Sequence, residues 1–214
     1  MTARWNFLSI TALAALLVVG VAFASEDEDA VYRNLVQRVQ SGDFTVDFRA
    51  LRMVCLKSTL CQPRGSKTDL ALLNRAESAN DYAGAIKIGE RLINQGFVNV
   101  EVHATLVKIY QDMQEPEKSK FHLEVTTALL RSILESGDGK TTETAYQVIC
   151  DREEYDTLTS LGLRYFGPMV SQTAVHENGH TFDRFEITNS VDGRSRFIFF
   201  NIDAFSEKSR AGAE

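Results

Sequence analysis

Apolar residues follow two different periods along this chain. Up to residue 136 they recur three or four positions apart, which is the spacing of an amphipathic helix, and beyond residue 163 they alternate with polar residues, as in a half-buried strand. The first pattern predicts helices over residues 30–40, 47–56, 68–79, 81–94, 100–113 and 117–136. We therefore expect an α+β fold in which antiparallel N-terminal helices precede a small antiparallel β-sheet.

The segment 137–162 joins the two patterns. Gly137 can end the preceding helix in the left-handed conformation, and residues 144–149 alternate in the manner of a short strand. Asp151 has the sequence context of an N-cap, because Glu154 follows three positions later and completes a capping box. A further helix is therefore expected from Asp151 up to a stop near residue 162.

Two dipeptides in the last third predict tight hairpins. Asn178-Gly179 is the strongest short hairpin signal, and Asp192-Gly193 is a second one. If both are two-residue loops, the pairs expected across the sheet are Ile187 with Ile198 and Phe185 with Phe200. Together with Ile202, these side chains would form one apolar face.

Residues 1–24 have the features of a signal peptide. Arg4 gives a positive start, residues 7–23 are mostly apolar, and Ala22-Phe23-Ala24 fits the small-residue cleavage pattern. An uncleaved membrane anchor is the alternative, although the apolar run is slightly shorter than the roughly 20 residues that a spanning helix needs. We expect an exported protein, periplasmic or secreted, that starts at Ser25 and keeps no stable membrane span.

The chain after the signal peptide is expected to have three parts. Residues 25–136 form the helical part and begin with a frayed acidic end at Ser25–Asp29. Residues 137–205 form an α+β part that contains the sheet, and residues 206–214 are a polar, loose tail.

Charge and cysteine content narrow the possible functions. The formal net charge is -6 and no block of Lys and Arg occurs, which argues against nucleic-acid binding. Of the three cysteines, Cys55 and Cys61 lie close together at an expected helix end and are the natural disulfide pair in an oxidising compartment. Cys150 would then be free. The alternative is that all three are small buried thiols.

Part of the helical region is similar to tetratricopeptide repeats. Asn80-Asp81-Tyr82-x-x-Ala85-Ile86 resembles the second helix of one repeat, and His103-x-x-Leu106-x-x-x-Tyr110 resembles the first helix of the next. This resemblance implies a groove for a peptide, with His103 and Tyr110 as candidate contacts. A helical hairpin that serves only as a scaffold is the alternative.

Most of the chain after residue 24 carries a second set of motifs. They are Asp47-Phe48-x-x-Leu51-Arg52, Ser136-Gly137-Asp138-Gly139, Thr144-Ala145-Tyr146-x-Val148-Ile149, Glu153-Glu154-Tyr155 and Phe199-Phe200-Asn201-Ile202. As a set they resemble an uncharacterised bacterial family, domain of unknown function 4919. The resemblance implies export, and it implies no activity or catalytic residue.

His176-Glu177-Asn178-Gly179-His180 has the order of a zinc-protease motif. That chemistry requires a helix, because only helical pitch puts both histidines on one face. Here a hairpin turn lies inside the motif, so His176 would pair with Thr181 and His180 with Glu177. The imidazoles would then point to opposite faces, and we expect no metal site.

The segment Gly137–Thr141 ends like a phosphate-binding loop. The full pattern requires a glycine where Leu134 stands, and it follows a strand, whereas this segment follows a predicted helix. A helix stop and a turn explain the glycines, so no nucleotide cofactor is expected.

An acidic cluster gives the main enzymatic alternative. Asp151, Glu153, Glu154 and Asp156 could supply a general acid and base, although a helix N-terminus also favours acidic residues. We expect a non-enzymatic interaction module with a protein or peptide partner. The alternative is an envelope hydrolase that uses Glu153, Glu154 and Asp156.

The contacts of such a partner are expected at the junction between helices and sheet. Functional residues gather on loops that rigid elements hold in place. Asp138, Lys140, Thr141 and Glu153 lie at this junction, and the fold alone gives them a weaker explanation than it gives their neighbours. They are therefore the candidate binding residues, beside His103 and Tyr110.

Overall fold

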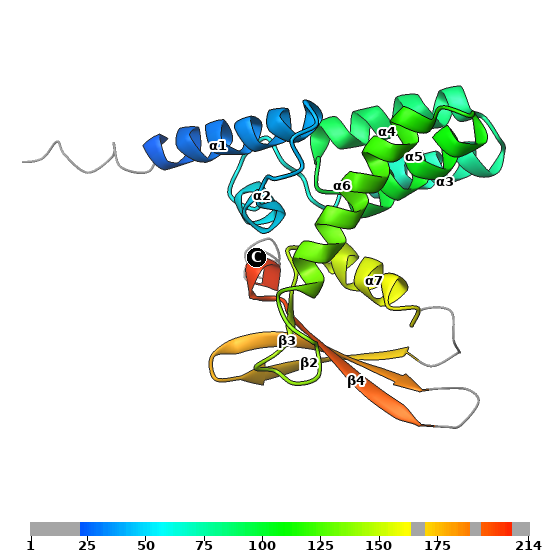
Figure 1. The fold of residues 1–214 in the computed structure, drawn as a ribbon. Coiled ribbons are helices and arrows are strands. Elements are labelled where there is room, and N and C mark those ends of the chain that lie inside the picture. Colours follow the sequence, from blue (N-terminus) through cyan, green and yellow to red (C-terminus); the bar gives the residue numbers. More distant parts are fainter. Residues whose placement is uncertain (1–21, 164–169, 189–193, 207–214) are drawn as a thin grey trace, which may run out of the picture.

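The computed structural model describes residues 22–163, 170–188 and 194–206. The helices are α1 (Ala22–Gln40), α2 (Phe48–Cys55), α3 (Lys67–Ser78), α4 (Tyr82–Gln95), α5 (Val100–Asp112), α6 (Pro116–Leu134) and α7 (Asp151–Ser160). The strands are β1 (Tyr146–Gln147), β2 (Val170–Glu177), β3 (His180–Thr188) and β4 (Ser195–Asn201). Figure 1 shows most of the helices in one layer and the sheet below it, which confirms the predicted α+β class.

Four helices of the first layer begin directly after a polar residue that caps their first turn. In each case a polar side chain accepts a hydrogen bond from the backbone N–H three residues further on, which satisfies one of the unpaired donors of the first turn. These N-caps are Asp47, Ser66, Asp81 and Asn99. The observed starts lie within one residue of the expected ones.

The acidic segment Ser25–Asp29 differs from its prediction. It belongs to α1 rather than forming a frayed end. The carboxylate of Asp29 accepts hydrogen bonds from the Ser58 hydroxyl at 2.7 Å and from the backbone N–H of Thr59 at 2.7 Å, which ties the start of α1 to the loop after α2. None of the described helices is long and apolar enough to cross a bilayer.

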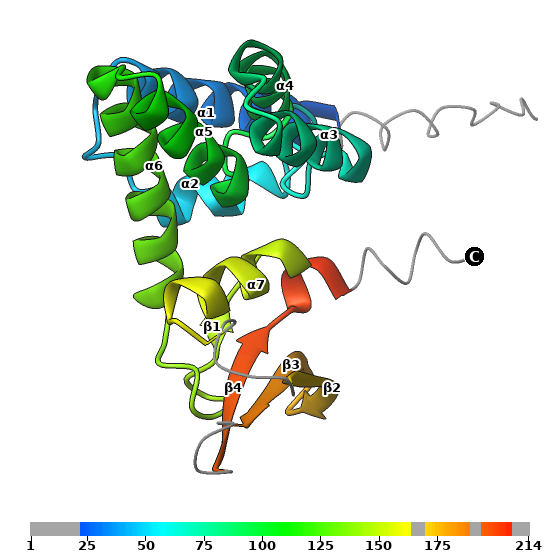
Figure 2. The same ribbon diagram turned by 90° about the vertical axis from the view of Figure 1, so that its right-hand side faces the viewer.

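Helix α6 connects the layers of the molecule. Its Val125 and Leu129 pack in the core that α1 and α2 form with residues 97–100, whereas Ile133 packs with the sheet. A separate core lies between α3, α4 and α5. Figure 2 shows α6 running from the helical layer down towards the sheet, with α7 between that layer and the strands.

The sheet has the order β1-β4-β3-β2 and is mixed, not purely antiparallel as expected. Strand β1 pairs in parallel with β4, with Tyr146 opposite Phe200. The expected strand over residues 144–149 is reduced to two residues. Side chains take up the neighbouring backbone donors: the N–H of Gln147 donates to Ser136 Oγ, and that of Ile149 donates to Glu153 Oε2.

The first hairpin has the predicted register and the second does not. Glu177 pairs with His180 around Asn178 and Gly179, both of which have positive φ angles, as a two-residue turn requires. In the second hairpin Phe185 lies opposite Ile198, and Ile187 lies opposite Arg196, so the register is shifted by two residues.

The observed register excludes the second turn that was expected. Thr188 pairs with Ser195, so Asp192-Gly193 is not a two-residue loop between paired neighbours; residues 189–193 lie outside the described residues. A shift of two keeps every side chain on its original face. The expected apolar face is therefore present and packs as one core; it consists of Phe185, Ile187, Ile198, Phe200 and Ile202.

Candidate functional site

A cleft of about 660 Å³ lies between α7 and the helical layer. Its walls come from α5, α6, α7, the end of α3 and the segment before α3. Apolar contacts are available at Val100, Ala104 and Leu130, and the volume lies within the range of small-molecule and peptide side-chain pockets. Because α5 and α7 are far apart in the sequence, the cleft exists only in the folded chain.

Charged side chains of both signs line this cleft. Four are basic and four are acidic, so the lining carries no net formal charge. Arg152 on α7 pairs with Glu101 on α5, and Lys108 on α5 pairs with Glu77 on α3. A ligand that matches this lining would carry both charges or neutral polar groups beside apolar ones, rather than one strong charge.

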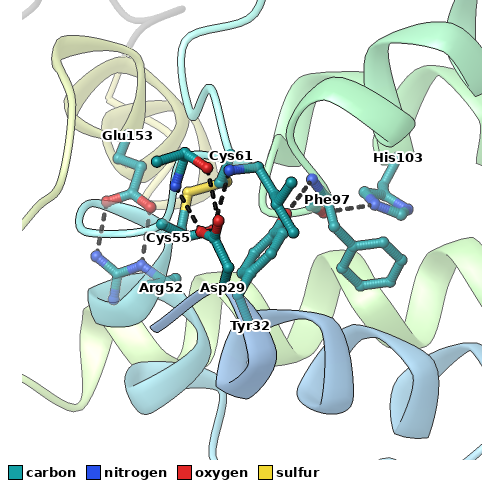
Figure 3. Close-up of a disulfide and its surroundings, with 11 residues drawn as sticks. Asp29, Tyr32, Arg52, Cys55, Cys61, Phe97, His103 and Glu153 are labelled. Atoms are coloured by element: carbon teal, nitrogen blue, oxygen red, sulfur yellow. Dashed lines mark hydrogen bonds and ion pairs between the residues drawn. A yellow bond between two sulfur atoms is a disulfide. The ribbon is translucent and has the colours of Figure 1, made fainter. Parts of the chain in front are cut away.

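The position of α7 beside the cleft depends on a buried ion pair. Arg52 on α2 donates from Nε to Glu153 Oε1 at 2.8 Å and from Nη2 to Glu153 Oε2 at 2.6 Å (Figure 3). This bidentate geometry gives two parallel, charge-assisted hydrogen bonds. The two side chains are 2% and 3% exposed. Arg52 also donates to the Ser132 hydroxyl on α6 and to the carbonyl of Gln147.

Because of this pair, the prediction that Glu153 is a binding or catalytic residue is wrong. The side chain is buried and saturated by Arg52 and by the N–H of Ile149, so it is neither a surface contact for a partner nor a group that can reach a substrate. The prediction that Asp151 is the N-cap of α7 is also wrong. Cys150 is the N-cap of α7, Asp151 is its first residue, and the Asp151 carboxylate lies 3.0 Å from Arg64 Nε at the surface.

Glu154 is the most unusual carboxyl group of the described chain. It is fully buried, and neither of its oxygens has a hydrogen-bond partner by distance and angle among the described residues. Burial, with the negative charge of Asp183 as the next cause, raises the pKa of Glu154 to about 9. The group is therefore neutral at pH 7. It does not line the cleft, so its raised pKa is not accompanied by access for a substrate.

The exposed turn after α6 satisfies its own polar groups. The carboxylate of Asp138 accepts hydrogen bonds from Lys140 Nζ at 2.7 Å and from Thr144 Oγ1 at 2.6 Å. These bonds, with that of Lys140 first, hold the pKa of Asp138 below its usual range. Thr141 Oγ1 contacts Thr144. Asp138, Lys140 and Thr141 are thus together as predicted, but Glu153 is not exposed beside them.

His103 and Tyr110 lie in the interior rather than on a groove. His103 is fully buried and Tyr110 is 6% exposed. His103 Nε2 lies 2.9 Å from the carbonyl of Phe97, and its Nδ1 lies 2.9 Å from Nδ1 of His122, which stacks on Tyr110. Since a carbonyl only accepts, His103 carries its proton on Nε2 and accepts from His122. The prediction that these residues face a peptide does not fit this burial.

The cysteines adopt the arrangement that the sequence favoured. Cys55 and Cys61 form a disulfide (Figure 3). Cys150 is a buried free thiol. Burial raises the pKa of Cys150 above its usual range, so the thiol is not activated.

The histidines of the zinc-protease-like motif have separate environments. His176 pairs across the hairpin with Thr181, and His180 pairs with Glu177, as predicted. His180 Nδ1 lies 2.6 Å from Asp203 Oδ2, a contact within the sheet end. The described residues contain no cluster of three or more side chains suited to a metal ion.

Neither the cleft nor the buried ion pair that positions α7 beside it is predicted from the sequence. The one available indication was Arg52, a charged residue on the otherwise apolar stripe of Phe48, Leu51 and Cys55. A charge on such a stripe implies a buried partner. Its partner lies 101 positions away, and no local pattern identifies it.

Comparison with known proteins agrees with the resemblance seen in the motifs. The model of the family described as a domain of unknown function (DUF4919) matches residues 23–210. No curated protein and no solved structure matches the chain significantly. The comparisons identify no tetratricopeptide repeat, so that part of the resemblance stays a prediction. The match extends over nearly the whole chain, and the protein is therefore a member of the family of domain of unknown function 4919.

Proposed function

We propose that this protein is an exported, non-enzymatic interaction module that holds an extended segment of a partner protein in the cleft between α5, α6 and α7. The observation that carries the proposal is the lining of that cleft, which combines apolar contacts with balanced, paired charges. An extended peptide offers both kinds of group at short intervals. Export is supported by the pattern of residues 1–24 and is compatible with the Cys55–Cys61 disulfide.

The paired charges would contribute more to the selectivity of such a site than to its binding affinity. Arg152 and Glu101 already satisfy each other, as do Lys108 and Glu77. A partner side chain can replace one member of a pair only by offering the same charge in the right place. Mismatched segments would leave a charge unpaired, which costs binding free energy.

The acidic cluster supports a hydrolase less well. A general acid must come within hydrogen-bond reach of the reacting group. Glu153 is bound to Arg52, and Glu154 is enclosed, so only Asp156 of the three candidate acids lines the cleft. The raised pKa of Glu154 is the single observation in favour of acid–base chemistry. Hydrolytic activity that disappears in Glu154→Gln while binding persists would favour the alternative.

Photo-crosslinking tests the binding proposal directly. A photoreactive amino acid at Thr105, inside the cleft, should crosslink a discrete partner in intact cells. Ala104→Trp should abolish the crosslink, because residue 104 is exposed within the cleft and a larger side chain would fill it. Gln111→Trp is the matched control, since residue 111 is exposed on the same helix outside the cleft. A crosslink that survives Ala104→Trp would contradict the proposal.

A further inference from the structure

Strand β2 forms an open edge of the sheet. It is the last strand in the order β1-β4-β3-β2 and pairs with β3 at every position from Val170 to Glu177, without a bulge. Among the described residues it has no neighbour on its outer side, and Figure 2 shows it at the margin of the sheet, away from β4. Side chains 171–174 and 176–177 are exposed.

The direction of the free backbone groups on β2 can be deduced. The carbonyl of Thr181 accepts from the N–H of Ile202, so the odd-numbered residues of β3 point towards β4. The even-numbered residues therefore point towards β2, where they pair with its odd-numbered residues. The N–H and C=O groups of the even-numbered residues of β2 therefore point outwards; these residues are Val170, Gln172, Ala174 and His176.

This edge lacks the devices that usually protect an exposed strand. Edge strands are commonly blocked by proline, by lysine or by a bulge. Between Ser171 and His176 the sequence is Ser-Gln-Thr-Ala-Val-His, which contains no proline, glycine, lysine or carboxylate. An unprotected edge of this length is suited to pairing with another strand.

We propose that the occupant is a second copy of this chain, with the two β2 strands antiparallel about a two-fold axis at Ala174. Outward-pointing residues must face each other in such a ladder, which restricts the register to even-numbered pairs. With Ala174 opposite its own copy, Gln172 faces His176, so the three central outward-pointing positions, 172, 174 and 176, are paired. The pairing would join the two sheets into one continuous sheet.

The side chains fit this register on both faces. The smallest residue of the strand, Ala174, lies on the axis, where two copies of one side chain meet. On the opposite face Thr173 lies across from Val175, a favourable β-branched pair, and Glu177 lies across from Ser171. No charge faces a like charge within the strand pair, which matters for a chain with a net charge of -6.

A cysteine scan tests the register. In Ala174→Cys the two thiols would lie on the axis, with Cα atoms about 5.5 Å apart, and a short thiol–thiol crosslinker should produce a covalent dimer of the full chain. Ser171→Cys is the control: residue 171 is also exposed, but its two copies are offset by six residues, or roughly 20 Å. Cys150 is buried and stays unchanged in both variants.

Ala174→Pro tests the contribution of the backbone. The N–H of residue 174 points outwards, so proline removes bonds to the partner copy and leaves the ladder to β3 intact. The dissociation constant of the dimer, measured by sedimentation or light scattering, should rise about tenfold or more, while the circular dichroism spectrum stays unchanged.

Three results would overturn the proposal. The first is a purified Ala174→Cys chain that forms no covalent dimer. The second is equal crosslinking of Ala174→Cys and Ser171→Cys, which would indicate random collision. The third is an Ala174→Pro chain that is folded and still dimerises as well as the unchanged protein.

Discussion

The guanidinium group of Arg52 on α2 and the carboxylate of Glu153 on α7 form a bidentate ion pair in the protein interior. Both side chains are almost completely buried, and the guanidinium also bonds to Ser132 on α6 and to the carbonyl of Gln147 in β1. The pair thus joins elements of the helical layer and of the sheet layer. It places α7 as one wall of the cleft.

Removing one member of this pair should destabilise the fold strongly. Arg52→Ala leaves Glu153 buried without a cation, and breaking a buried pair in this way costs about 3–5 kcal/mol. Urea unfolding measures the loss. The double variant Arg52→Met with Glu153→Leu should recover most of the stability, because no charge remains buried. A single Arg52→Ala that unfolds at the same urea concentration as the unchanged chain would show that the pair is not structural.

The buried carboxyl group of Glu154 should make the protein less stable as pH rises. Its pKa is about 9 in the fold, against an ordinary value of 4.5 for a glutamic acid, so between these values only the unfolded chain loses the proton. Stability should therefore fall from about pH 4.5 to about pH 9. Glu154→Gln removes this dependence and should stabilise the fold by on the order of 2 kcal/mol at pH 7. Thermal melts at several pH values compare the two chains.

The His103–His122 pair should make the protein less stable as pH falls, which is the opposite of the effect of Glu154. Burial lowers the pKa of His103 to about 3 and that of His122 to about 4, from the ordinary histidine value of 6.5. Below about pH 6.5 the unfolded chain binds protons that the fold does not, so stability should fall as the solution is acidified towards pH 4. His122→Phe removes one of these protons, and the stability curve should become shallower on the acid side. An unchanged slope would mean that other groups dominate acid unfolding.

Two aspartates near helix starts should differ in their effect on stability. Asp47 caps α2 through a hydrogen bond to the N–H of Ala50, and Asp47→Ala should cost about 1 kcal/mol. Asp151 makes no cap, and its pair with Arg64 is half exposed, so Asp151→Ala should change stability by about 0.5 kcal/mol or less. Urea midpoints of the two variants give the comparison. Equal losses would contradict the assignment of Cys150 as the cap.

The sequence predicts those parts of the fold that local chemistry determines. Apolar spacing is a local feature, and it predicted the helices that begin at Phe48 and Tyr82 to within one residue. Asn178-Gly179 defines its turn because both positions need a positive φ angle. The predicted register of β3 and β4 differs from the observed one by two residues. The hydrophobic pattern cannot detect such a shift, because it leaves the same side chains on the apolar face.

The candidate site depends on distant residues, and for that reason it was predicted less well. The sequence predicts Glu153 as an available acid at a helix start, because nothing near it in sequence accounts for its charge. Arg52 does so only once α2 and α7 are packed together. The cleft has the same origin, since Glu101 and Arg152 meet through the fold alone.

Hydrogen exchange on the complex with the partner recovered by crosslinking is the most direct test of the central claim that the cleft binds the partner. The account predicts slower amide exchange in α5 and α7, over residues 100–108 and 151–160, with little change in the turn at residues 138–144. Protection confined to that turn, with α5 and α7 exchanging as in the free protein, would contradict it.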